Sequence, residues 1–140
     1  MRRARVNGVL ALAISIAACS PSPPQPPAPA DSPAASTKGA RLYAGNCIGC
    51  HQENGQGIPG VYPSLVASPV VLGDPDRLAA WIVQGRRPPV TPAGRFPTIM
   101  PQFAWLKPAD VAALLTYLRS SFGNHAAPLD AGAVAQALQE

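Results

Sequence analysis

The chain has 140 residues, enough for one ordinary domain, and its 11 Lys and Arg against 7 Asp and Glu give a formal charge of +4. Only 13% of the residues are charged, two are lysines and eight are aromatic, so the clustered cations and aromatic platforms of a nucleic-acid-binding protein are missing. Three cysteines are too few for a disulfide scaffold. The 18 prolines exceed the usual share of about 5%, and seven of them lie from Pro21 to Pro33, which indicates a linker.

The N-terminus has the pattern of a secretory signal peptide over residues 1–18. Three arginines in the first five residues precede an apolar run from Val6 to Ala18. A transmembrane helix needs about 20 apolar residues, so this run is too short for one. We therefore expect the chain to be exported.

A cysteine follows the predicted signal directly. The residues Ile16-Ala17-Ala18-Cys19 resemble the bacterial lipobox, in which the cysteine is acylated after cleavage, so we expect Cys19 to carry a lipid anchor. The residue after it is Ser20 rather than Asp, which favours the outer membrane. Ordinary cleavage to a soluble periplasmic protein is the alternative, and an uncleaved anchor is a third possibility.

A low-complexity segment of Pro, Ala and Ser follows, from Ser20 to Thr37. Such a composition cannot bury a core, and as an extended polyproline chain it would span roughly 55 Å at about 3.1 Å per residue. The predicted organisation is a signal peptide (1–18), a lipidated cysteine with a Pro-rich linker (19–37), one folded domain (38–125) and a C-terminal tail (126–140).

The motif that carries chemistry is Cys47-Ile48-Gly49-Cys50-His51, the C-x-x-C-H signature of haem c attachment. Two thiols three residues apart on a helical turn can reach the two vinyl groups on one edge of the porphyrin. The adjacent His51 then lies under the iron as its proximal ligand. Export fits this prediction, because haem c is attached after export in bacteria.

Three other uses of these cysteines fit less well. A thioredoxin-like pair belongs in a βαβ pattern, and no strand pattern precedes this one. A zinc site needs a second pair of ligands, but the only other histidine is His125 and Cys19 is assigned to the lipid. A plain disulfide leaves His51 unexplained.

The region from Gly39 to Asn124 resembles class I cytochrome c. In that family a small residue, here Gly39, lets the N-terminal helix cross the C-terminal helix closely, and Tyr43 follows on the same helix. Tyr62-Pro63-Ser64-Leu65 is similar to the family's Pro-x-Leu segment. The resemblance implies that the Pro63 carbonyl accepts the Nδ1 proton of His51 and that Leu65 packs on the haem, with Pro59 as the alternative to Pro63.

Met100 is the candidate for the sixth iron ligand. The only other methionine, Met1, belongs to the predicted signal, and Met100 lies 49 residues after His51 in a Pro-rich loop just before a helix. Met100-Pro101-Gln102-Phe103 resembles the Met-Pro-x-Phe of many bacterial monohaem cytochromes, where the thioether raises the haem potential and closes the distal site. A core methionine is the ordinary alternative, and His125 is a weaker candidate ligand.

The predicted elements are all helical, with no alternating strand pattern. The first helix should run from about Lys38 to Cys50. A second has Asp74 as its N-cap and ends at Gly85, with an apolar face made by Leu78, Trp81 and Ile82.

Two more helices follow. One begins near Pro108, has Asp110 in its first turn and is stopped by Gly123, with an apolar face made by Val111, Leu114, Leu115 and Leu118. A short helix is expected after Asp130, with Val134 and Leu138 on one side. The fold class is therefore all-α, and the resemblance implies the small cytochrome c fold, in which N- and C-terminal helices cross around a covalently bound haem.

The predicted domain, 38–125, has eight basic residues against four acidic ones. Arg86, Arg87 and Arg95 lie in an irregular segment before Met100. Three interpretations remain open: the arginines are solvated, they pair with the haem propionates, or they form a positive rim that attracts an acidic partner.

The resemblance implies an electron carrier that moves one electron between a periplasmic dehydrogenase or quinol-oxidising complex and a downstream acceptor. The alternative is a cytochrome subunit of a multi-subunit dehydrogenase. Residues Tyr117 to Asn124 resemble the end of the C-terminal helix in small cytochromes that serve periplasmic dehydrogenases. A haem enzyme or gas sensor with a labile Met100 is less favoured. We expect redox proteins and a membrane as partners, and neither nucleic acid nor a small-molecule substrate.

Overall fold

The computed structural model describes residues 33–86 and 96–139 of the chain. Six helices lie in this part: α1 (Pro33–Asn46), α2 (Ile48–His51), α3 (Pro69–Leu72), α4 (Pro75–Gln84), α5 (Pro108–Ser120) and α6 (Ala131–Ala137). The described residues contain no strand, and their one bridge pairs Ile58 with Tyr62. The predicted all-α class is confirmed. The predicted signal peptide and Cys19 lie outside the described residues, as do Arg87 and Arg95.

The first helix differs from its prediction at both ends. α1 begins at Pro33, five residues before the expected start, because proline suits the first position of a helix and alanines follow it. It ends at Asn46, and α2 follows after a break at Cys47, whose φ is −117°. Helical hydrogen bonds continue across the break, since Cys47 N donates to Tyr43 O (2.8 Å) and His51 N to Cys47 O (2.9 Å).

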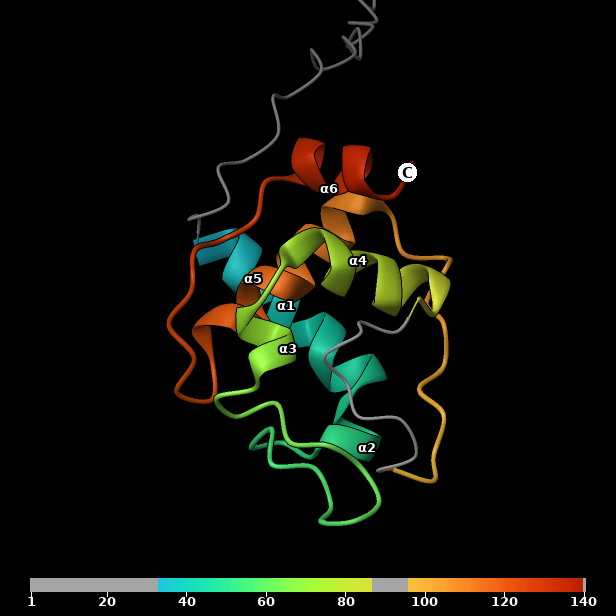
Figure 1. Cartoon of the computed structure of the whole chain (residues 1–140). Coiled ribbons are helices and arrows are strands. Elements are labelled where there is room, and N and C mark those ends of the chain that lie inside the picture. The colour runs from blue at the N-terminus through green and yellow to red at the C-terminus, as the bar shows by residue number, and fades with distance from the viewer. Residues whose placement is uncertain (1–32, 87–95, 140) are drawn as a thin grey trace, which may run out of the picture.

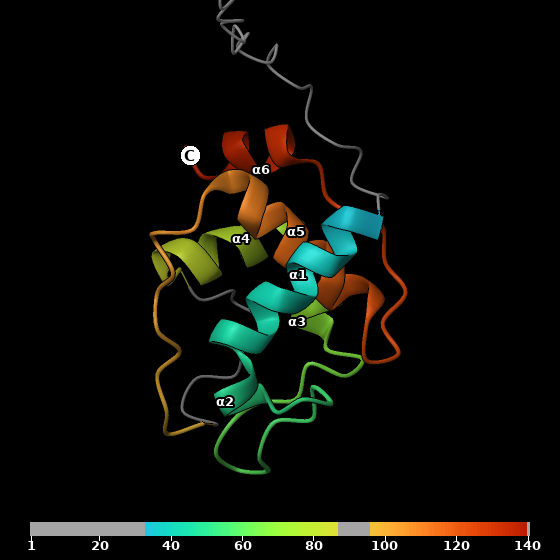
Figure 2. The same cartoon turned by 180° about the vertical axis from the view of Figure 1, so that it is seen from behind.

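The crossing of α1 and α5 forms the centre of the fold (Figures 1 and 2). Gly39 lies at the contact: a Cβ there would come within 2.6 Å of Tyr117 Cβ and closer still to the Ala113 carbonyl oxygen. Tyr43, one turn later, is only 2% exposed and packs against Tyr117 and Phe122. The predicted close crossing is confirmed, and Tyr43 is buried beside it.

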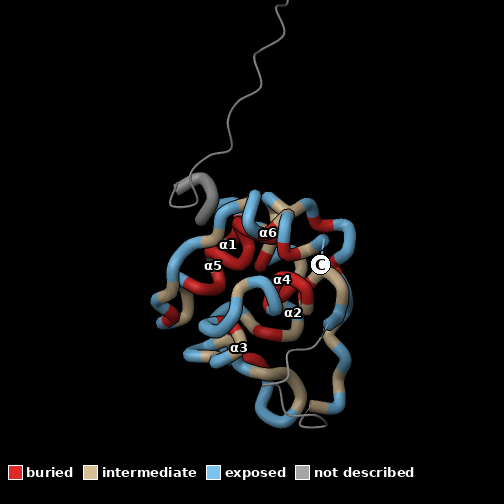
Figure 3. The backbone as a smooth tube through the Cα atoms, turned by 45° about the horizontal axis from the view of Figure 1, so that its top comes forward, coloured by how far each residue is buried: buried red, intermediate tan, exposed pale blue. Residues whose placement is uncertain are grey.

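The core gathers the apolar faces of α1, α4, α5 and α6, and Figure 3 marks the buried residues in red along the backbone. The predicted faces of α4 and α5 are confirmed, except that Trp81 is only partly buried and faces the pocket described below. The large buried side chains are Tyr43, Val71, Leu78, Ile82, Phe103, Leu106, Val111, Leu114, Leu115, Leu118 and Val134.

Local caps set the ends of two helices as predicted. The Asp74 side chain accepts from the backbone N–H groups of Asp76 (3.0 Å) and Arg77 (3.3 Å), and Gly85 ends α4 in the left-handed region at φ 72°. The Asp130 side chain caps α6 in the same way. The four-residue helix α3 was not predicted.

The C-terminal segment packs on the domain. α6 contacts α5 and α4 at the top of Figure 1. Leu129 N donates to the Thr116 hydroxyl (3.0 Å), and Gln84 Nε2 donates to Leu138 O (3.0 Å). The predicted short helix after Asp130 is therefore part of the same compact unit in the described residues.

Candidate cofactor site

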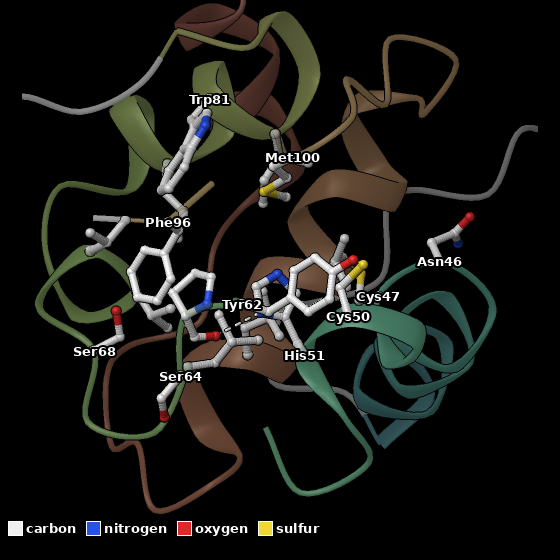
Figure 4. A pocket seen from close by; sticks show the side chains of 18 of the residues that line it. Asn46, Cys47, Cys50, His51, Tyr62, Ser64, Ser68, Trp81, Phe96 and Met100 are labelled. Carbon is white, nitrogen blue, oxygen red and sulfur yellow. Dashed lines mark hydrogen bonds between the residues drawn. The ribbon is translucent and has the colours of Figure 1, made fainter. Parts of the chain in front are cut away.

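One pocket of about 380 Å³ lies between α2, α4, α5 and the two long connections, 52–68 and the segment that begins at Phe96 (Figure 4). Cofactor pockets usually measure about 300–1,000 Å³ and are mostly apolar with a few polar groups. No Asp, Glu, Lys or Arg is among the described residues that line this pocket. Its apolar walls are made by Leu65, Val70, Val71, Leu78, Trp81, Ile82, Phe96, Ile99, Phe103, Leu114 and Leu118.

The C-x-x-C-H segment lies on one side of this pocket. The break at Cys47 and the single turn of α2 bring Cys47, Cys50 and His51 to the pocket wall together. Both thiols are free. Burial, with a smaller contribution from Cys50, raises the pKa of Cys47 to about 11, so this thiol stays protonated at neutral pH.

His51 is 9% exposed, and its Nδ1 lies 3.0 Å from the Pro63 carbonyl oxygen, the bond drawn dashed in Figure 4. This is the contact that the resemblance implied for Pro63, and the structure does not give it to Pro59. Burial lowers the pKa of His51, while the hydrogen bond with Pro63 acts in the opposite direction. The neutral imidazole donates from Nδ1 and so leaves Nε2 as the ligating atom.

The loop between His51 and Pro63 is tightly folded because glycines occupy its crowded positions. Gly57 has φ 63°, and a Cβ on it would lie 2.5 Å from the carbonyl oxygens of Pro63 and Tyr62. Its N–H donates to His51 O (2.9 Å). Tyr62 also lines the pocket, where a hydrogen bond with Cys50 raises the pKa of its phenol.

Met100 reaches the same pocket from the other connection. Figure 4 shows the Met100 thioether and the His51 ring both directed into the pocket. The segment around Met100 is tied on both sides, since the Thr98 hydroxyl donates to Val61 O (2.7 Å) and Phe103 N donates to Ile82 O (2.9 Å). The structure thus brings together Cys47, Cys50, His51, Pro63, Leu65 and Met100. His125 is exposed and does not line the pocket.

The donor set fits a haem bound through two thioethers. The pocket offers two thiols on one edge, an imidazole whose orientation is held by a carbonyl, a thioether, and apolar walls. A metal held by acidic or cysteine clusters fits less well, because no three His, Cys, Asp or Glu side chains among the described residues are placed so that they could hold a metal ion.

Two buried polar residues near the site were missed from the sequence. Asn124 and Arg119 are 0% and 7% exposed. The Arg119 guanidinium donates to the carbonyl oxygens of Val71 (2.8 Å), Gly73 (3.0 Å) and Ala127 (3.2 Å), so it joins α5, α3 and the C-terminal segment. Nothing local in the sequence distinguishes either residue from a surface one. Of the three arginines of the predicted rim, the structure describes Arg86, which is exposed.

The comparisons with known proteins agree with this chemistry. Residues 36–122 match the family model described as cytochrome c. The chain is 34% identical over 95 residues to cytochrome c-552 of Thermus thermophilus, a match that covers 64% of each chain. It is 33% identical over 90 residues to the cytochrome c subunit of the quinone alcohol dehydrogenase of Gluconobacter oxydans, covering 63% of this chain and 19% of that one.

A further relative is the fructose dehydrogenase cytochrome subunit of Gluconobacter japonicus, with 34% identity over 109 residues, covering 72% of this chain and 22% of that protein. The match thus spans somewhat less than two thirds of the Thermus protein and about a fifth of the dehydrogenase subunits.

Proposed function

We propose that this chain carries one electron at a time between a periplasmic dehydrogenase or quinol-oxidising complex and a downstream acceptor. The chain belongs to the cytochrome c family and binds haem c covalently. One observation carries the proposal: two cysteine thiols, an oriented imidazole and a thioether converge on one apolar pocket. The described lining contains no carboxylate or ammonium group that would serve acid–base chemistry on a substrate.

The residues of the pocket have distinct roles in this function. Haem c, when bound, supplies an iron that alternates between the ferric and ferrous states. Cys47 and Cys50 would hold it covalently, and His51 would ligate the iron with an orientation that the Pro63 carbonyl maintains. Met100 would supply a second, thioether ligand. The apolar walls exclude water and disfavour the more highly charged ferric state, so they raise the reduction potential.

The ligand assignment is tested by Met100→Ala. The wild-type holoprotein should show the weak long-wavelength absorption band that marks sulfur–iron ligation, and Met100→Ala should lose it. Gln102→Ala, a change at an exposed residue of the same segment, is the control and should keep the band. A band that persists in Met100→Ala would show that another residue ligates the iron, and a labile wild-type band would favour an enzyme or a gas sensor.

A second function, as the electron-transfer subunit of a dehydrogenase complex, is supported by the names of two relatives, both described as cytochrome subunits of dehydrogenases. The two functions differ in their partners. Purification of the native protein from membranes, with identification of the proteins that co-purify in constant ratio, separates a permanent subunit from a mobile carrier.

We further propose export by the 1–18 signal, acylation of Cys19, and a tether that holds the domain off the membrane, with the outer membrane favoured by Ser20. The tether is limited to residues 19–32, because residues 33–37 of the predicted linker belong to α1. No helix among the described residues has the length and hydropathy to cross a bilayer. Cys19→Ser should move the protein from the membrane to the soluble periplasmic fraction. Continued membrane association of Cys19→Ser would refute the lipid anchor.

A further inference from the structure

Asn124 lies where the end of α5 meets the loop that carries Pro63. Its side chain is 0% exposed. Nδ2 donates to the carbonyl oxygens of Leu118 (2.8 Å) and Leu65 (3.0 Å), and Oδ1 accepts from Ala67 N (2.9 Å). Two carbonyl acceptors and one N–H donor leave a single orientation of the amide that satisfies them all.

The segment held by Asn124 has an unfavourable backbone conformation. Ala67 has φ 47°, in the left-handed region that residues other than glycine rarely adopt. On the other side, Leu65 N donates to Gly55 O (2.7 Å). Leu65 and Ala67 are therefore fixed between the end of α5 and the glycine-rich loop, and the bonds to Asn124 balance the strain at Ala67.

Pro63 lies two residues before Leu65, and its carbonyl is the group 3.0 Å from His51 Nδ1. Proline has no N–H with which to anchor itself. The intervening Ser64 makes a long contact of 3.4 Å from its hydroxyl to Gly55 O. On the N-terminal side, Tyr62 is held by paired backbone bonds with Ile58 (3.0 and 2.8 Å). On the C-terminal side, the position of the Pro63 carbonyl depends on how Leu65 and the residues after it are held.

We propose that Asn124 is a positioning residue that keeps the Pro63 carbonyl on His51 and thereby lowers the reduction potential of the bound haem. This inference rests on the proposed function. Donation of the Nδ1 proton makes the imidazole a more basic ligand, which favours ferric iron. When the Leu65–Ala67 segment is released, the bond to Pro63 weakens and the potential rises.

The test compares Asn124→Ala with Thr116→Val in the holoprotein. Thr116 is a second buried polar residue, in the C-terminal half of α5, and its hydroxyl accepts from Leu129 N in the C-terminal segment. Asn124→Ala should raise the reduction potential, and the His51 Nδ1 proton, observed by NMR of the reduced protein, should exchange about tenfold faster. Thr116→Val should lose thermal stability with neither change.

The proposal is overturned if Asn124→Ala, at a similar loss of thermal stability, matches Thr116→Val in both potential and exchange rate. A lowered potential would also overturn it, because it would mean that water had entered the pocket. If Asn124→Ala does not fold, Asn124→Asp is compared by the Nδ1 exchange rate alone. This variant retains the acceptor for Ala67 N and loses the donor to Leu118 and Leu65, but its negative charge would itself lower the potential. A wild-type holoprotein that cannot be reduced and reoxidised reversibly would instead refute the proposed function.

Discussion

Replacing Gly39 by alanine should destabilise the protein, although the same change on an open helix face stabilises a helix. Gly39 lies in α1 where it crosses α5. A Cβ there would lie 2.6 Å from Tyr117 Cβ and nearer still to the carbonyl oxygen of Ala113. Because one of these atoms is backbone and the other is a Cβ, no change of rotamer relieves the overlap, and the two helices must move apart.

The magnitude follows from two opposing contributions. Alanine is favoured over glycine inside a helix by about 1 kcal/mol. Carbon atoms pack at roughly 3.5–4.0 Å, so relief of a 2.6 Å approach requires a local separation of about 1 Å. Overpacking of this kind costs about 1–3 kcal/mol. Separation also loosens the contact of Tyr43 with Tyr117, whose ring centroids are 5.6 Å apart. With a packing cost near the middle of that range, about 2 kcal/mol, set against the helix gain of about 1 kcal/mol, we expect a net loss of about 1 kcal/mol in the free energy of unfolding.

The assay is guanidinium unfolding of the holoprotein followed by circular dichroism. Gly45→Ala is the matched control, because Gly45 lies on the same helix with nothing within 4 Å of its added Cβ. It should stabilise the protein by about 0.5–1 kcal/mol. If both variants are more stable than wild type, the close crossing of α1 and α5 is not what requires glycine at position 39.

Three further predictions concern stability. Burial raises the pKa of Tyr43 to about 12 from 10.0. The stability that its neutral phenol contributes is therefore complete below about pH 10 and is lost as pH rises through about 12. The guanidinium midpoint of the wild type should fall across this range, and that of Tyr43→Phe should fall less. An equal fall of the two midpoints with pH would contradict this prediction. Asp74→Ala should cost about 1 kcal/mol in thermal unfolding through loss of the α4 cap, and no loss relative to Asp74→Asn would argue against the cap. Arg119→Met should cost about 3 kcal/mol or more in urea unfolding, because three carbonyl oxygens lose their donor. The exposed Arg77→Met is its control, and an equal effect of the two would refute a structural role for Arg119.

The haem attachment motif, both ends of α4 and the starts of α5 and α6 were predictable because their chemistry is local. The spacing of Cys47, Cys50 and His51 lies within five consecutive residues, and the caps at Asp74 and Asp130 act on backbone groups two and three residues away. The apolar faces of α4 and α5 were predictable for the same reason. Apolar residues recur at helical spacing, and this spacing alone determines which residues share a face of the helix.

Local patterns also have limits within one helix. The break at Cys47 and the early start of α1 at Pro33 were missed, and so was α3, whose four residues are too few to show a period. Likewise, the spacing of Pro59 and Pro63 from His51 left two candidates for the histidine's partner. The fold of the glycine-rich loop selected Pro63, because the carbonyl of that residue is the one brought to Nδ1.

The sequence alone determined that this protein is helical and has a haem attachment site. The spacing of the cysteines and histidine, the helix caps and the helical periodicity are all short-range properties. Only the tertiary structure decided which polar side chains hold the pocket together. Arg119 bonds to Val71, 48 residues away, and Asn124 to Leu65, 59 residues away. Until the chain folds, nothing distinguishes such residues from ordinary surface ones, because their partners are backbone carbonyls that every residue possesses.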